Sequence, residues 1–294
     1  MADTTDRSLI SAAQLNRHKV TYRVVLTLVI VIFTLIFIGP LYFLFTDGLK
    51  STPEAVQVPP TIVPAHVHPG TYASAWSRVG IGRLLVNTLY YAFGALAFQL
   101  VFDVAAAYSL SRLRPVLGNV IFALMLATLM IPATVLVVPQ YVTVSDLPLL
   151  HLNLIGSPEA IWLPSVANAF NIFLLKRFFD SIPAELLAAA AIDGASPLRT
   201  LRSVVLPISR PIIGVVSIFA LVATWKDFLW PLLVEYGYNP NRETLNVGIF
   251  EAASTTPQNL VLAASAMAAV PTLVFFLFFQ RNILSGLTAG SLKG

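Results

Sequence analysis

The feature that most constrains this chain is a run of apolar residues, 24–46, that contains no charged side chain. About 20 apolar residues in a helix cross the hydrocarbon core of a bilayer, which is ~30 Å thick. Five later segments are also long and apolar enough: 84–107, 120–142, 160–179, 212–234 and 260–279. The sequence therefore predicts an all-α integral membrane protein with six transmembrane helices.

The composition supports a membrane protein. Hydrophobic residues make up 57% of the chain and charged residues 11%, whereas soluble domains carry about 25% charged residues. The chain has no cysteine, which excludes disulfides, thiolate catalysis and cysteine-ligated metal sites. The net charge of +4 is modest and indicates basic residues on the cytoplasmic side of a membrane rather than a nucleic-acid partner.

The basic residues also predict the orientation. Six spans place both termini on one side, and if that side is cytoplasmic, thirteen Lys and Arg residues fall inside and four fall outside. This distribution matches the positive-inside rule. We therefore expect a multi-pass protein with a cytoplasmic tail at 1–23, a six-span domain at 24–283 and a second cytoplasmic tail at 284–294.

A polar interruption lies between the fourth and fifth predicted spans, on the cytoplasmic side. Pro183 suits the first turn of a helix, and Glu185 lies where the helix dipole favours a negative charge. Gly194 suits the left-handed position after the helix end, and Ser196 with Pro197 can start a second helix. The pattern predicts a helix–turn–helix. These residue types alone leave open whether it is a surface connector or a docking element for a partner.

The same stretch carries a family resemblance. The segments "IPAELLAAAAIDGAS" and "VVLP" resemble the cytoplasmic loop signature of permease subunits of ATP-binding-cassette (ABC) importers in the carbohydrate branch. The matching residues are Ile182, Pro183, Glu185, Leu186, Ala189, Ala190, Ile192, Asp193, Gly194, Ala195, Leu206 and Pro207. Ala188 stands where the family has a glutamate. The segments "AAAYSLSRLR" and "MIPATVLVVPQYV" extend the resemblance, and the end "GLTAGSLKG" resembles the tail of the maltose-type, binding-protein-dependent permeases.

The resemblance implies a bacterial sugar importer, with this chain in the cytoplasmic membrane. Its partners would be a second permease, two ATPase subunits and an extracytoplasmic solute-binding protein, while ATP and Mg would bind in the ATPase subunits. The coupling loop would be 180–208, and its contact residues would be Glu185, Ala188, Ala189, Ala190, Asp193, Gly194, Ala195 and Pro207. The alanine at 188 leaves one expected ionic contact without its carboxylate. In the tail, Thr288, Gly290 and Lys293 would reach the ATPase dimer.

Polar side chains inside the predicted spans are candidates for a translocation path. They are Asn87, Asp103, Asn168, Asn171, Trp225 and Asp227. Asp227 follows Lys226 in the fifth span, where charged groups are expensive and commonly functional. The alternative is structural, since amides and carboxylates often hold helices together and tryptophans often anchor at the membrane interface.

No catalytic constellation stands out. The chain lacks the Gly-x-x-x-x-Gly-Lys-Ser/Thr phosphate loop, and it shows no nucleophile–base pair and no metal-ligand set. We therefore expect no enzyme activity, metal or cofactor in this chain. Two alternatives remain: a membrane-embedded enzyme, and a self-sufficient ion-coupled transporter that would use Asp103, Lys226 and Asp227. The ion-coupled transporter would have no role for the helix–turn–helix at 180–208.

Overall fold

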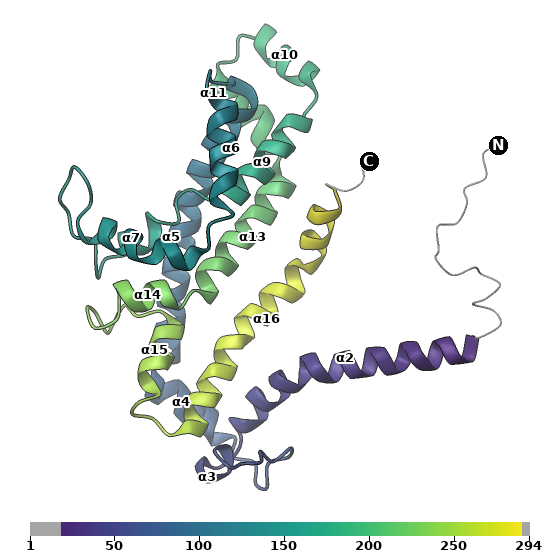
Figure 1. The fold of residues 1–294 in the computed structure, drawn as a ribbon, viewed down its shortest axis with the longest axis vertical. Coiled ribbons are helices and arrows are strands. Elements are labelled where there is room, and N and C mark those ends of the chain that lie inside the picture. The colour runs from purple at the N-terminus through teal and green to yellow at the C-terminus, as the bar shows by residue number, and fades with distance from the viewer. Residues whose placement is uncertain (1–18, 290–294) are drawn as a thin grey trace.

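The computed structural model describes residues 19–289, which form helices joined by turns, with one isolated β-bridge between Leu147 and Leu152 (Figure 1). The first elements are α2 (Lys19–Asp47), α3 (Thr52–Ala55), α4 (Gly70–Val79), α5 (Ile81–Tyr108) and the π-helical turn η1 (Ser109–Leu113). The middle elements are α6 (Gly118–Thr128), α7 (Ala133–Ser145), α8 (Glu159–Trp162), α9 (Ala169–Ser181) and α10 (Ala184–Ile192). The last are α11 (Pro197–Thr200), the π-helical η2 (Leu201–Val205), α12 (Leu206–Ile208), α13 (Arg210–Lys226), α14 (Leu229–Val234), α15 (Leu245–Ala252) and α16 (Gln258–Ala289).

The first helix, α2, stands apart from the rest of the molecule. It leaves the body at its C-terminal end and projects away from the other helices (Figure 1). That end is tied down by Lys50, whose Nζ donates to Asp47 Oδ1 and to the carbonyl of Thr61, both at 2.6 Å. The side chains of residues 20–38 of α2 are all exposed, and those of residues 43–47, next to the body, are half-buried. An apolar helix exposed in this way is stable in lipid or against another protein, but not in water.

Three clusters of buried apolar side chains hold the body together along its length. The cluster farthest from α10 joins α4, α5, α15 and α16 around Leu84 and Leu245. A second joins α5, α9 and α13 around Leu175 and Val216. Between them, a third joins α5, α7, α8 and α14 around Trp230. The helix α5 takes part in all three clusters and forms the axis of the body.

Three described helices are long and apolar enough to cross a membrane as single pieces: Val20–Asp47, Ile81–Leu113 and Gln258–Phe278. They correspond to the first, second and sixth predicted spans. The third predicted span is not continuous, because α6 and α7 meet at an angle of 108°. Pro132, with φ −58° and ψ 129°, precedes α7 and its ring ends the hydrogen-bond ladder of α6. A second proline, Pro139, lies inside α7 without ending it.

The fourth predicted span is also not a single helix. The short α8 ends at Trp162, and Pro164 lies in the turns that follow. Asn168 then caps α9, accepting a hydrogen bond from the backbone N–H of Asn171 at 3.1 Å. The helix α9 has 13 residues, about 20 Å of helix, which is too short to cross the hydrocarbon core alone.

The fifth predicted span is broken at the residue that was expected to lie within it. Asp227 has an extended backbone, with φ −66° and ψ 131°, so α13 ends at Lys226 and α14 begins at Leu229. The break is stabilised by Asn246, whose Nδ2 donates to the carbonyls of Trp225 and Asp227 at 3.1 and 3.3 Å. The expectation of a continuous helix is therefore wrong here, because a distant side chain satisfies the backbone groups that the break leaves free.

Candidate functional site

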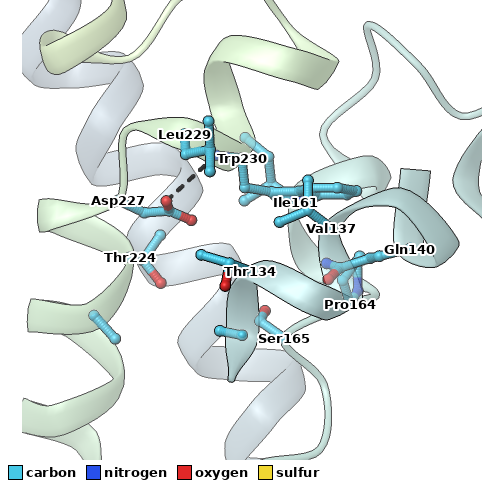
Figure 2. Close-up of a pocket in the computed structure, with 12 residues that line it drawn as sticks. Thr134, Val137, Gln140, Ile161, Pro164, Ser165, Thr224, Asp227, Leu229 and Trp230 are labelled. Carbon is cyan, nitrogen blue, oxygen red and sulfur yellow. Dashed lines mark hydrogen bonds between the residues drawn. The ribbon is translucent and has the colours of Figure 1, made fainter. Parts of the chain in front are cut away.

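The three helix breaks converge on one cavity of about 310 Å³ (Figure 2). The break between α6 and α7 contributes Thr134, the one between α8 and α9 contributes Ser165, and the one between α13 and α14 contributes Asp227. Irregular backbone at membrane depth is tolerated only where it is buried in protein or lines a water-filled cavity. The convergence therefore marks this cavity as the place where the fold departs from regular spanning helices.

The walls of the cavity combine apolar and polar groups. Figure 2 shows Asp227 and Thr224 on one side, facing Thr134 of α7 across the opening. The carboxylate of Asp227 accepts a long hydrogen bond, 3.5 Å, from the backbone N–H of Trp230. Gln140 and Ser165 lie on the other side. The apolar walls come from Val137, Ile161, Pro164, Leu229 and the ring of Trp230.

This lining suits an uncharged polyhydroxylated molecule. The hydroxyl of Thr134 and the amide of Gln140 make no hydrogen bond to any described residue, so both are available to a ligand. Amides and hydroxyls both donate and accept, and a carboxylate accepts, which together match sugar or polyol hydroxyls. The indole Nε1 of Trp230 already donates to the carbonyl of Ala160 at 2.9 Å. That bond fixes the ring, so its contribution to the cavity is apolar.

Of the six candidate path residues, only Asp227 lines this cavity. Trp225 is buried, its ring packs edge-on against Phe275 at a centroid distance of 6.1 Å, and it lines a separate hollow with Lys226. The sequence reasoning missed Thr134, Gln140, Ser165 and Thr224. These residues are polar and lie close to a helix break. They can be recognised as candidates only once the positions of the breaks are known.

Three other candidates lie together in the interior, away from the cavity. Asp103 is fully buried in α5, and its Oδ1 accepts from the backbone N–H of Asn168 at 2.9 Å. The side chains of Gln99 and Asn171 lie next to its carboxyl group. This cluster fixes the start of α9 against α5. The hydrogen bonds of the cluster stabilise the break between α8 and α9.

The last candidate, Asn87, holds the loop before α15. Its Nδ2 donates to the carbonyls of Asn241 and Glu243, at 2.8 and 3.0 Å. Nearby, the backbone N–H of Leu245 donates to the hydroxyl of Thr88 at 2.8 Å. Both contacts fasten the start of α15 onto α5, so the amide of Asn87 is already occupied.

The helix–turn–helix, which consists of α10, α11, η2 and α12 and is called the hairpin below, lies at the far end of the molecule from α4 (Figure 1). Gly194 has φ +73°, and its N–H donates to the carbonyl of Ala191 at 3.0 Å while that of Ala195 donates to Ala190 at 2.9 Å. This pair of bonds is the Schellman ending predicted for Gly194. Ser196 caps the second helix by accepting from the N–H of Arg199.

The second helix of the hairpin is built from three short elements, α11, η2 and α12. After α11, η2 and α12 carry the chain on through Leu206 and Pro207 to Ile208. The segment Pro197–Ile208 then meets α13 at 83°. Pro207 lies in the first turn of α12, where a backbone N–H would have no intrahelical partner. The missing N–H of proline therefore costs no hydrogen bond.

The surface of the hairpin is apolar and uncovered. No residue of α10 is buried, and Ile192 and Leu198 expose 86% and 64% of their surface. The predicted contact residues Glu185, Ala188, Ala189, Asp193, Gly194 and Pro207 are exposed, whereas Ala190 and Ala195 are half-buried.

The base of the hairpin is fixed to the body. Arg112 Nη2 donates to the carbonyls of Phe179 and Ile182, and Tyr108 Oη donates to the carbonyl of Pro197 at 3.0 Å. An exposed apolar element on a rigid base is the expected form of a docking site.

In the tail, Thr288 lies in the last turn of α16, and Gly290 and Lys293 lie outside the described residues.

Comparison with known proteins gives consistent matches over most of the chain. The model of the family described as binding-protein-dependent transport system inner membrane component matches residues 99–285. The sn-glycerol-3-phosphate transport system permease protein UgpE of Rhizobium meliloti (strain 1021) is 30% identical over 271 residues, covering 88% of this chain and 94% of the relative. The melibiose/raffinose/stachyose import permease protein MelC of Bacillus subtilis (strain 168) is 30% identical over 257 residues, covering 87% and 91%.

A solved structure has the same fold. A chain of a bacterial ABC transporter involved in the import of the acidic polysaccharide alginate superimposes with a TM-score of 0.77. The match covers 93% of this chain and 99% of the other at 21% identity. At that identity the likeness concerns the fold alone, and the fold is that of a transporter.

Proposed function

This chain belongs to the family of inner membrane components of binding-protein-dependent transport systems, and from that premise we propose that it is one of two permease subunits of a bacterial ATP-driven sugar importer. The named relatives import glycerol phosphate and oligosaccharides. The hydroxyl, amide and carboxylate groups of the cavity suit an uncharged sugar, as in the second of these relatives, better than an anionic phosphate ester. A second permease would complete the path, and two ATPase subunits and a solute-binding protein would complete the importer.

The observation that carries this proposal is the exposed apolar hairpin. The helix α10 packs on the body through the partly buried Leu187 but has no fully buried residue, so its exposed apolar face is suited to a groove on a soluble partner. The chain has no phosphate loop of its own. An ATPase subunit that receives the hairpin would supply the missing energy source.

One helix links the hairpin to the cavity. The helix α13 follows the second half of the hairpin after the 83° bend and ends next to Asp227. Its 17 residues make a rod of about 25 Å. A rigid displacement of the hairpin on ATP binding would therefore move the wall of the cavity, which is the coupling that alternating access requires.

The proposal keeps six membrane crossings with both termini in the cytoplasm. The helices α2, α5 and α16 cross as single pieces, and segments 120–142, 160–179 and 212–234 cross as broken helices around the cavity. The excess of basic residues on the hairpin side supports this orientation.

The test is reconstitution. This chain alone in liposomes should bind and hydrolyse no ATP, and the complex with its second permease and ATPase subunits should take up sugar when ATP and loaded binding protein are supplied. ATP turnover by the purified chain alone would overturn the assignment. Sugar uptake by the chain alone, driven by a proton or sodium gradient without ATP, would support the rival ion-coupled transporter.

A further inference from the structure

A second cavity, of about 520 Å³, lies at the hairpin end of the molecule. It is formed by η1, the loop that follows, the start of α6 and the end of α9. Three cationic side chains line it, Arg112, Arg114 and Lys176, against one carboxylate, Asp180. We propose that this cavity binds the headgroup of an anionic phospholipid. The site is separate from the sugar cavity, and only its test, which uses the assembled transporter, rests on the function proposed above.

The carboxylate in the cavity is already neutralised. Asp180 Oδ1 accepts from the hydroxyl of Ser111 at 2.6 Å, and its Oδ2 accepts from Lys176 Nζ at 2.8 Å. Lys176 also lies over the ring of Phe122, 5.0 Å from its centroid, which fixes the ammonium group at the cavity wall. Two guanidinium groups are left with no carboxylate partner among the described residues.

The two arginines differ in what they already bind. Arg112 uses Nη2 to hold the base of the hairpin, and its buried Nε has no partner in the described chain. Arg114 makes one long contact, from Nε to the carbonyl of Ser111 at 3.4 Å. Its Nη groups therefore remain free for a ligand. A free guanidinium fork binds phosphate oxygens in a bidentate way.

The start of α6 adds a backbone donor to the same cavity. Gly118 and Asn119, the first residues of this 11-residue helix, line it. The N–H of Gly118 already donates to the carbonyl of Pro115 at 2.8 Å, so the donor left at this helix start is the N–H of Asn119, which together with the helix dipole favours a bound anion. The guanidinium of Arg114 beside this helix start makes a phosphate group the best match to the cavity.

The surrounding side chains indicate that the phosphate belongs to a lipid. Leu113, Val116 and Leu117 flank the cationic residues, and they expose 54%, 102% and 62% of their surface. Val120 and Leu124 continue the exposed apolar surface along α6. Apolar groups next to a basic cavity suit acyl chains below an anionic headgroup, whereas a free phosphate ion gains nothing from them.

The experiment measures lipids retained by the full transporter complex. The complex should be purified in detergent after incorporation into phosphatidylglycerol-containing membranes, and its bound lipids counted by native mass spectrometry. We expect Arg114→Gln to reduce bound phosphatidylglycerol at least several-fold, and Arg114→Lys to retain more of it. The matched control is Arg23→Gln, an exposed arginine on α2 that should leave retention unchanged.

Two results would overturn the proposal. Equal retention of phosphatidylglycerol by wild type and Arg114→Gln would exclude this cavity as the site. Stabilisation of the complex by inorganic phosphate equal to that by a short-chain phosphatidylglycerol, lost in both cases in Arg114→Gln, would assign the cavity to a free anion. Because Arg114 has φ 47°, Arg114→Gly removes the charge while relieving backbone strain. If Arg114→Gln misfolds, this variant gives the same test.

Discussion

Gly194 is the residue on which the shape of the hairpin depends. Its φ of +73° is a left-handed conformation, and a Cβ built there would meet no atom within 4 Å. Gly194→Val should therefore strain the turn by about 1–2 kcal/mol without any clash. We expect weaker co-purification of the ATPase subunit and unchanged membrane insertion.

The control at this position is Gly194→Asn, because asparagine tolerates the left-handed region better than any β-branched residue. It should retain most of the ATPase association that valine loses. If valine and asparagine both behave as wild type in pull-down and in transport, the hairpin does not dock through this turn.

Gly94 allows the broken fourth segment to approach α5. A Cβ at this position would lie 2.3 Å from Cε2 of Trp162, whose ring stacks on Phe98 and donates through Nε1 to the carbonyl of Tyr91 at 3.2 Å. Gly94→Ala should displace the indole and destabilise the protein by about 1–3 kcal/mol. The measurement is the loss of the monodisperse size-exclusion peak on heating.

A matched substitution elsewhere separates crowding from helix propensity. Gly214 lies in α13 with open space around it, so Gly214→Ala should stabilise the protein by about 0.5–1 kcal/mol. Both variants make the same chemical change in a helix interior. Equal shifts of the melting temperature would show that contact with Trp162 does not limit position 94.

At the scale of elements, α15 carries a pH-dependent contact on the side opposite the hairpin. Glu243, in the loop before α15, is almost fully buried, and burial raises its pKa to about 7, with a further upward contribution from Glu251 and a downward one from Arg83. The folded state therefore holds a proton that the unfolded chain releases near pH 4.5. Stability from this group is fully present below about pH 4.5 and is lost as the pH rises to about 7.

The substitution Glu243→Gln tests that contact, since it imitates the protonated carboxyl. We expect the variant to remove much of the fall in protection of α15 between pH 5 and 7, as measured by hydrogen exchange. Glu159→Gln, at the start of α8, is the control. A wild-type pH profile in Glu243→Gln would show that this carboxyl does not control the loop.

The sequence predicted the helical elements well and their breaks less well. The apolar runs that became α2, α5 and α16 were expected correctly, although α2 and α16 contain the interior prolines Pro40 and Pro271. Each break has a local signal, Pro132, Pro164 or Asp227, but a proline or a charge can also be accommodated inside a spanning helix, as Pro139 is in α7. The deciding partners, such as Asn246 for the break at Asp227, are distant in sequence.

The hairpin was predictable in detail for the opposite reason. Its cap, its left-handed glycine and its proline act on neighbouring residues, so local pattern determines the turn. The cavity depends on three segments meeting in space, and no local pattern contains that information. Asp227 was found because a charge in a span is unusual, while Thr134 and Ser165 are ordinary residues whose importance comes from their position beside a break.

At the scale of the whole molecule, the C-terminal end provides the last test. The helix α16 continues as far as Ala289, so Thr288 lies on a helix that begins at the opposite end of the body, near α4 (Figure 1). If the tail reaches the ATPase dimer, as the family resemblance implies, deletion of 288–294 should leave the complex assembled, because the hairpin carries most of the docking. The stimulation of ATPase activity by loaded binding protein should change.

The measurement compares wild type and truncated complexes in proteoliposomes, with stimulated ATPase rate and sugar uptake recorded on the same preparation. Lys293→Gln separates the role of the charge from that of the chain length. A larger effect of the deletion than of Lys293→Gln would indicate that the backbone of the tail makes the contact, as the two deleted glycines at 290 and 294 would permit. If the truncated complex equals wild type in both readouts, the tail has no part in coupling, and the hairpin together with α13 must carry the signal alone.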